Sequence, residues 1–362
     1  MTRTEHILSE RERHGRRSLV VLPVAYPKEL LTAFDVLAVE LWGPPGPPRG
    51  PDAGRIQAYV CPLVRNALAF LGAGGADAVD GALFPHTCDS LQQLATLAPD
   101  LGGWAKPVLR FQHPRGPARP AARAYLESEL RALVGALEAF TGRAFDEDRL
   151  AAALDLHEAV DQARAALLDG TATSPLPAAE RYALLRRGEW LWPDDHLLEL
   201  RAALADPERP RRPGVPVLVT GYVPEPAAFV QVLEEAGARV AADDYAAVGR
   251  RVVRARTRGA PWERLLERYW AAPPCPTRAA TQEARLAHLS ALLDRSGARG
   301  MIIHTVRSCE PELFDVPALR TLCAGRGLPV LQLETDLEAE LPAQAVTRLE
   351  AFAELLTSGG QA

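Results

Sequence analysis

Lysine is nearly absent from this chain of 362 residues, in which Lys28 and Lys106 are the only two. A phosphate-binding loop that ends in Gly-Lys-Ser/Thr is therefore excluded, because neither lysine follows a glycine. A G-x-S-x-G nucleophile elbow is missing as well. We therefore expect neither ATP chemistry on a loop of this chain nor a serine hydrolase.

Long apolar runs are also missing. No stretch approaches the ~20 apolar residues that a membrane-spanning helix needs, and the charged segment 1–18 does not resemble a secretory signal. The net charge is −5 without an obvious basic patch, which argues against a nucleic-acid partner. We expect a cytoplasmic protein that engages neither membrane nor nucleic acid.

Cysteine is scarce, and the chain has no C-x-x-C pair. In a reducing compartment the cysteines are expected to be free thiols, and an odd number of them indicates packing, metal binding or catalysis. The five cysteines are Cys61, Cys88, Cys275, Cys309 and Cys323.

The first and last thirds of the chain alternate short apolar strands with helices. The strands are rich in Val, Leu and Phe and do not alternate with polar residues, which is typical of parallel strands buried on both faces. The expected strands are 19–24, 36–41, 82–84, 108–111, 216–220, 238–242, 300–304 and 330–333. The expected helices are 28–34, 62–71, 90–97, 227–236, 281–295, 317–324 and 344–356.

Between these thirds, from about residue 121 to 206, the pattern is helical. Leu126, Leu130, Leu133 and Leu137 recur at helical spacing, and a Pro/Arg-rich linker covers 206–216. The sequence thus predicts the α/β class, with two small doubly wound parallel-sheet (Rossmann-like or flavodoxin-like) domains at 1–120 and 213–362. A helical segment and linker at 121–212 separates them.

Two of the cysteines occupy matching places in the two α/β thirds. Cys88 and Cys309 each end a predicted strand and precede a helix, and the stretches around them are similar. The similarity indicates either an internal duplication or the shared pattern of parallel α/β folds. Ligand sites of open parallel sheets lie at such strand ends.

The other cysteines differ in their surroundings. Cys323 shares a helical face with leucines and is expected to be a core thiol, and Cys275 in a Pro-rich turn is expected to be structural or incidental. Cys61 precedes a helix, as Cys88 and Cys309 do, and free N–H groups at a helix start favour a thiolate. Residue chemistry leaves two interpretations. Either the three thiols are unrelated, or they converge on a tetrahedral or cubane metal site that is one protein ligand short. An all-thiolate trio favours an iron–sulfur cluster over zinc.

Four stretches of the chain together resemble one known family. They are "YPKELLTAFDVLAVELWG" (26–43), "CPLVRNAL…DGALFPHTCD" (61–89), "VLVTGYVPEP…EEAGARVAADDYAAVGRR" (217–251) and "SCEPELFDVPALRTLCAGRGLPVLQLETDLEAELPAQAVTRLEAF" (308–352). In order and content they are similar to the 2-hydroxyacyl-CoA dehydratase/benzoyl-CoA reductase family.

The resemblance implies that Cys61, Cys88 and Cys309 hold one [4Fe–4S] cluster between the two α/β domains, with one iron site open to a small ligand or substrate. It also implies a related second subunit, as a hetero- or homodimer, an ATP-dependent activator protein and an acyl-CoA substrate. In a dehydratase, one electron would give a ketyl radical anion at the thioester carbonyl, which expels the neighbouring hydroxyl. Alternatives are benzoyl-CoA reductase-type ring reduction and a non-catalytic electron-relay subunit of the same complex.

Acidic residues near the strand ends are the candidate catalytic groups. They are Glu29, Asp89, Glu310 and Glu334. Helix capping or solvation accounts equally well for each of them. A cluster-free binding protein that has kept the fold is a further alternative.

Overall fold

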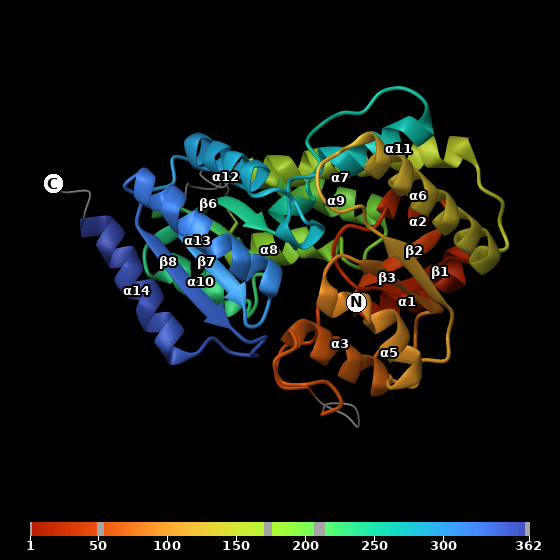
Figure 1. The fold of residues 1–362 in the computed structure, drawn as a ribbon, viewed down its shortest axis with the longest axis horizontal. Coiled ribbons are helices and arrows are strands. Elements are labelled where there is room, and N and C mark those ends of the chain that lie inside the picture. The colour runs from red at the N-terminus through yellow and green to blue at the C-terminus, as the bar shows by residue number, and fades with distance from the viewer. Residues whose placement is uncertain (1, 49–53, 170–175, 206–213, 359–362) are drawn as a thin grey trace.

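The computed structural model describes residues 2–48, 54–169, 176–205 and 214–358, and it contains two four-stranded, all-parallel sheets (Figure 1). The first sheet has the order β2-β1-β3-β4 and the second the order β6-β5-β7-β8. The strands are β1 (Arg17–Val21), β2 (Val36–Glu40), β3 (Gly81–His86), β4 (Val108–Gln112), β5 (Val215–Gly221), β6 (Ala238–Tyr245), β7 (Gly300–Val306) and β8 (Val330–Thr335). All eight expected strands and the α/β class are confirmed.

Both sheets are buried on both faces, as their uniformly apolar strands predict. In β1, Leu19 and Val21 join one apolar cluster while Val20 joins another, because successive side chains point to opposite faces. In β5, Leu218 is separated from Val217 and Val219 in the same way. Helices must therefore cover both sides of each sheet.

The helices around the first sheet form two layers. Residues of α1 (Arg3–His14), α3 (Pro62–Gly72) and α5 (Leu94–Asp100) pack on one face. Residues of α2 (Lys28–Ala33), α6 (Pro120–Thr141) and α7 (Glu147–Asp169) pack on the other. The predicted leucine stripe is confirmed, since all four of its side chains are buried in α6.

The second sheet is covered in the same manner. On one face lie α10 (Ala228–Glu235) and α14 (Ala343–Ser358), and on the other α12 (Gln282–Ser296) and α13 (Glu310–Gly325). The remaining elements are α4 (Asp89–Gln92), α8 (Ala178–Arg187), α9 (Pro193–Leu204), α11 (Pro261–Ala271), η2 (Gly249–Arg251) and η3 (Pro276–Arg278). None of the described helices has the length and apolar content to cross a membrane.

Two helix predictions were wrong at their boundaries. The expected helix at 90–97 is divided into α4 and α5. The expected helix at 317–324 begins much earlier, because Pro311 and not Pro317 occupies its first turn. Pro317 lies inside α13, where it lacks a backbone N–H donor.

Helices α1 and α11 were not predicted. Although α11 comes from the last third of the chain, it packs against α6 and α7, and Figure 1 shows it on the N-terminal half of the molecule. Leu265 of α11 belongs to the same apolar cluster as Leu130 of α6. The predicted linker residues 206–213 lie outside the described residues, and the domain boundaries at 120 and 212 stay predictions.

Candidate functional site: thiols and a charged cavity

Three cysteines occupy helix starts at the carboxyl ends of the sheets. Cys88 follows β3 and is the N-cap residue of α4, while Cys309 follows β7 and is the N-cap residue of α13. Cys61 is the N-cap residue of α3. The strand order reverses between β1 and β3 and between β5 and β7, and open α/β sheets bind ligands beside such a reversal.

The thiols are close enough to perturb one another. Burial raises the pKa of Cys88 to about 11, and the neighbouring Cys61 contributes to the rise. Burial also raises the pKa of Cys309 well above its ordinary value, and again Cys61 and Cys88 add to the effect. Burial raises the pKa of Tyr222, which directly follows β5, with contributions from all three thiols and from Cys275. The Tyr222 phenol therefore lies within electrostatic range of all four thiols.

The surroundings of the three thiols suit a thiolate-held iron–sulfur cluster. Burial raises the pKa of Cys61, but the N–H groups of Leu63 and Val64 at the start of α3 lower it. Such N–H groups stabilise negative charge on sulfur once iron replaces the proton. His86 Nε2 and Thr87 Oγ1, just before Cys88, are buried without a hydrogen-bond partner. Orphaned groups of this kind mark places where an ion or polar ligand binds.

Strained backbone lies on both sides of this region. Ser308, directly before Cys309, has φ 57°, and Ala25, shortly after β1, has φ 59°. A left-handed conformation costs a non-glycine residue on the order of 1–3 kcal/mol and is concentrated at ligand sites. At both turns the surrounding structure therefore holds the backbone in a conformation that local preference alone would not select.

The two remaining cysteines lie in different surroundings. Cys323 is fully buried with its Sγ 3.6 Å from Met301 Sδ, as expected of a core thiol. Cys275 is also buried, but Arg250 Nη1 donates to its Sγ at 3.5 Å and Thr277 Oγ1 lies 3.0 Å from it. The sequence predicts Cys275 to be structural or incidental, whereas the structure gives it a cationic neighbour, Arg250, and an electrostatic effect on Tyr222.

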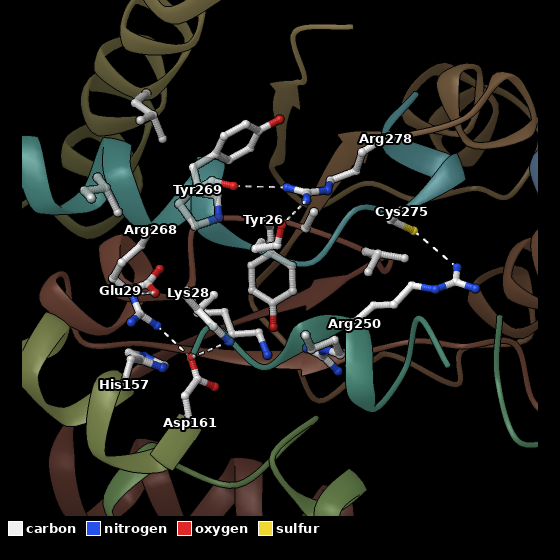
Figure 2. Close-up of a pocket in the computed structure, with 18 of the residues that line it drawn as sticks. Tyr26, Lys28, Glu29, His157, Asp161, Arg250, Arg268, Tyr269, Cys275 and Arg278 are labelled. Atoms are coloured by element: carbon white, nitrogen blue, oxygen red, sulfur yellow. Dashed lines mark hydrogen bonds and ion pairs between the residues drawn. The ribbon is translucent and has the colours of Figure 1, made fainter. Parts of the chain in front are cut away.

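A cavity of about 110 Å³ lies beside Cys275 (Figure 2). It is lined by Tyr26 and Pro27 after β1, by Lys28 and Glu29 in the first turn of α2, and by side chains from α7 and α11. Arg250 and Cys275 close its other end, as Figure 2 shows. The cavity thus combines residues from the first, middle and last thirds of the chain.

One wall of the cavity is a chain of buried ion pairs. Arg268 Nε lies 2.9 Å from Glu29 Oε1, and Arg268 Nη2 lies 2.8 Å from Asp161 Oδ2. Burial raises the pKa of Glu29, but the charge of Arg268, together with His157 and hydrogen bonds to the carboxylate, lowers it to about 2. Burial lowers the pKa of His157 to about 3, so that this imidazole is neutral. The wall therefore offers fixed charges and one neutral imidazole.

Lys28 is the cavity group whose charge can change near neutral pH. Burial, and next the charge of Arg251, lower its pKa to about 7, although Glu40 opposes them. Lys28 Nζ lies 3.7 Å from Glu40 Oε1. Glu40 also accepts a hydrogen bond from Tyr26 Oη at 2.7 Å and forms a bidentate ion pair with Arg251. Lys28 can therefore take up or release a proton inside the cavity.

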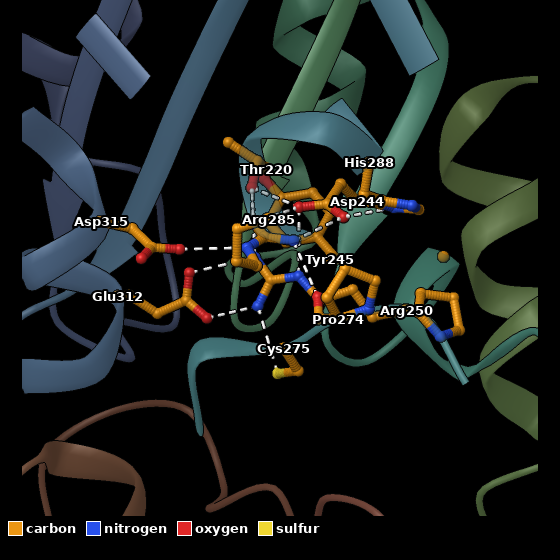
Figure 3. A network of polar contacts seen from close by, with 12 residues as sticks. Thr220, Asp244, Tyr245, Arg250, Pro274, Cys275, Arg285, His288, Glu312 and Asp315 are labelled. Atoms are coloured by element: carbon orange, nitrogen blue, oxygen red, sulfur yellow. Dashed lines mark hydrogen bonds and ion pairs between the residues drawn. The ribbon is translucent and has the colours of Figure 1, made fainter. Parts of the chain in front are cut away.

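A second buried network connects the cavity to α13 (Figure 3). Arg250 is fully buried and pairs with Asp244 at 3.1 Å and with Glu312. Glu312 stands in the first turn of α13, whose N-cap is Cys309. Arg250 thus ties Cys275 to the helix that begins at Cys309. The other members are Thr220, Arg285, His288 and Asp315.

The four acidic candidates fall into two groups. Glu29 lines the cavity. Asp89, Glu310 and Glu334 are exposed, and Asp89 and Glu334 pair with surface arginines at 3.1 and 3.2 Å. Apart from Glu29 and Cys275, the cavity residues were not predicted, because they carry no sequence motif of their own. The place of Lys28 at the start of the helix that follows β1, at the strand reversal, was the signal that could have found it.

Comparison with known proteins gives consistent matches over nearly the whole chain. The family model described as 2-hydroxyglutaryl-CoA dehydratase, D-component, matches residues 23–356. The lactoyl-CoA dehydratase beta subunit of Anaerotignum propionicum is 23% identical over 94% of this chain and 92% of its own length. The (R)-2-hydroxyglutaryl-CoA dehydratase beta subunit of Acidaminococcus fermentans is 23% identical over 97% and 95%. A benzoyl-CoA reductase subunit of Thauera aromatica is 24% identical over 88% and 86%.

Proposed function

Because the chain belongs to the 2-hydroxyglutaryl-CoA dehydratase D-component family, we propose that it is the iron–sulfur subunit of a CoA-thioester dehydratase or reductase. The observation that carries the proposal is the set of three cysteines at three helix starts, all within electrostatic range of Tyr222. Cys61, Cys88 and Cys309 would hold a [4Fe–4S] cluster with one iron open. When bound, the cluster supplies low-potential one-electron chemistry.

The proposed reaction is dehydration of a 2-hydroxyacyl-CoA through a ketyl radical on the thioester, with ring reduction of the benzoyl-CoA type as the alternative. The similarity to a dehydratase subunit supports the first reaction, and the similarity to a benzoyl-CoA reductase subunit supports the alternative. A cavity of about 110 Å³ admits only a small part of such a substrate, given that an engineered cavity of ~150 Å³ holds benzene. The acyl end would therefore enter the cavity while the CoA portion stays outside.

Side chains of the cavity would then orient the acyl end and handle protons. The ion pairs of Arg268 with Glu29 and Asp161 fix one wall. Lys28, with its pKa lowered to about 7 by burial, would exchange a proton with the bound group. General acid–base groups work best when their pKa lies near the operating pH.

Two protein partners belong to the proposal. The relatives are each named as one subunit of an enzyme, which supports a related second subunit. The sequence lacks a phosphate-binding loop, which supports a separate ATP-dependent activator as the source of the electron.

Replacing single cysteines tests the cluster. Cys309→Ala should lose most of the iron and acid-labile sulfide after strictly anaerobic purification, because one of three thiolate ligands is gone. Cys323→Ala is the matched control, since this thiol is also buried and lies on the same helix, α13. Cys323→Ala should retain both the iron and the acid-labile sulfide. Wild-type protein that folds but holds no iron under anoxia, or equal iron in the two variants, contradicts the proposal.

An electron relay that never touches substrate is the second candidate. It is favoured by the burial of Cys61 and Cys309 and by Cys275, a further buried thiol near Tyr222. Electron paramagnetic resonance of the reduced, loaded protein with added acyl-CoA separates the two. A changed cluster signal supports a role in substrate binding, and an unchanged one supports the relay.

A further inference from the structure

A second group of ligating side chains lies where α1 meets α9. His6 and Glu10 stand one turn apart in α1, both buried, and Asp195 lies in the first turn of α9. One ring nitrogen of His6 and one carboxylate oxygen of each acid lie within 4.8 Å of one another. These residues play no part in the proposed function.

The imidazole of His6 is short of a partner. The residue is 2% exposed, and its Nε2 is buried without a hydrogen bond. Leaving a buried polar atom unsatisfied costs free energy. The ring packs edge-on against Trp190, with the centroids 5.5 Å apart, and this contact holds it beside the two carboxylates.

The two acids leave oxygens available for a cation. Arg16 contacts Oε2 of Glu10 and lies over the ring of Trp192, 3.7 Å from its centroid. A carboxylate ligand is commonly held by a second hydrogen-bonding group in this way. Asp195 is exposed and has no ion-pair partner among the described residues.

We propose that His6, Glu10 and Asp195 bind a divalent transition-metal ion, with water completing its coordination. One imidazole and two carboxylates suit Zn²⁺, Co²⁺ or Mn²⁺, and the absence of thiol donors disfavours soft ions such as Cu⁺. Because His6 and Glu10 lie in α1 and Asp195 in α9, the ion joins the N-terminal helix to the helical segment.

Cobalt titration of the full chain tests the site. Co²⁺ held by nitrogen and oxygen gives visible ligand-field bands, whereas cysteine ligands add intense thiolate charge-transfer bands in the near ultraviolet. In the difference spectrum of anaerobic protein with and without Co²⁺ we expect the first without the second, and a higher melting temperature with Co²⁺, because the ion binds only the folded state.

Asp195→Asn should weaken Co²⁺ binding by about tenfold or more, and it should abolish the thermal shift at the same Co²⁺ concentration. Because Asp195 is exposed, the variant should fold, which circular dichroism checks. Asp148→Asn is the matched control, as Asp148 is an exposed acid in the first turn of another helix. Equal Co²⁺ affinity in the two variants, no Co²⁺ binding in the wild type, or thiolate bands in place of ligand-field bands overturns the proposal.

Discussion

At the scale of single residues, the cavity is shaped by a competition between burial and pairing. Arg268 keeps Glu29 ionised although both are largely withdrawn from water. Lys28 has a more distant partner, with 3.7 Å between its Nζ and Glu40 Oε1. Burial, and next the charge of Arg251, therefore lower the pKa of Lys28 to about 7. Neighbouring groups in one cavity thereby acquire different protonation behaviour.

Acid should destabilise the protein through Glu29. Its pKa is lowered from 4.5 to about 2 in the folded state, so its stabilising contribution is complete above pH 4.5 and is lost as the pH falls toward 2. The contribution is roughly 3 kcal/mol. Urea unfolding at a series of pH values should show a shallower loss of stability over this range for Glu29→Gln than for the wild type.

The control for this measurement is Glu350→Gln, which changes an exposed carboxylate in α14. It should leave the dependence of the unfolding free energy on pH as in the wild type. The assignment to Glu29 is wrong if Glu29→Gln and the control give parallel curves.

At the scale of elements, three helices begin at residues that are poor caps. Cys61, Cys88 and Cys309 make no side-chain capping hydrogen bond, whereas Thr281 at the start of α12 accepts one from the N–H of Ala284. Ser, Thr, Asp and Asn are the usual N-cap residues. Helices α2, α6 and α9 also begin without a side-chain cap, so the proposed ligand role of these cysteines rests on their mutual electrostatic influence and not on capping.

The close approach of β5 and β7 requires glycine at position 221. A Cβ there would lie 2.0 Å from the carbonyl oxygen of His304. Gly221→Ala should therefore destabilise the protein, by on the order of 1–3 kcal/mol or more, since the strand must shift. The melting temperature measures the loss.

Gly135→Ala is the counterpart within α6, where an added Cβ meets no atom within 4 Å. It should stabilise the protein by up to about 1 kcal/mol, because alanine is the better helix former. Shifts of the same sign in both variants would contradict the packing at β5.

At the scale of the whole molecule, buried charges connect the two sheets. Glu40 at the end of β2 pairs with Arg251 in η2, and the Tyr222 hydroxyl donates to the carbonyl oxygen of Pro23 at 3.4 Å. Arg268 of α11 pairs with Glu29 and so binds a helix from the last third of the chain to the first half of the molecule. The two sheets are therefore held together by polar contacts as well as by apolar packing.

Glu40→Gln should be strongly destabilising, because it leaves Arg251 buried without its carboxylate partner. Removing one member of a buried pair costs about 3–5 kcal/mol, and guanidinium unfolding measures it. Glu127→Gln is the control: it breaks an exposed pair with Arg131 in one helix, worth only about 0.3–0.5 kcal/mol. Similar losses in both variants would show that the Glu40 pair does not hold the halves together.

The eight strands, most of the helices and the position of each cysteine relative to a strand or helix could be predicted from the amino-acid order. These features depend on local hydrophobic periodicity and on residues adjacent in the chain. Helix α11 was missed, because its apolar side chains contact α6 and α7, which lie far earlier in the chain. The folded arrangement was needed to show that four thiols act on the pKa of Tyr222 and that Lys28, Asp161 and Arg250 line one cavity. Charge pairing and cavity shape depend on distances in space between residues far apart in the chain, and no local pattern encodes those distances.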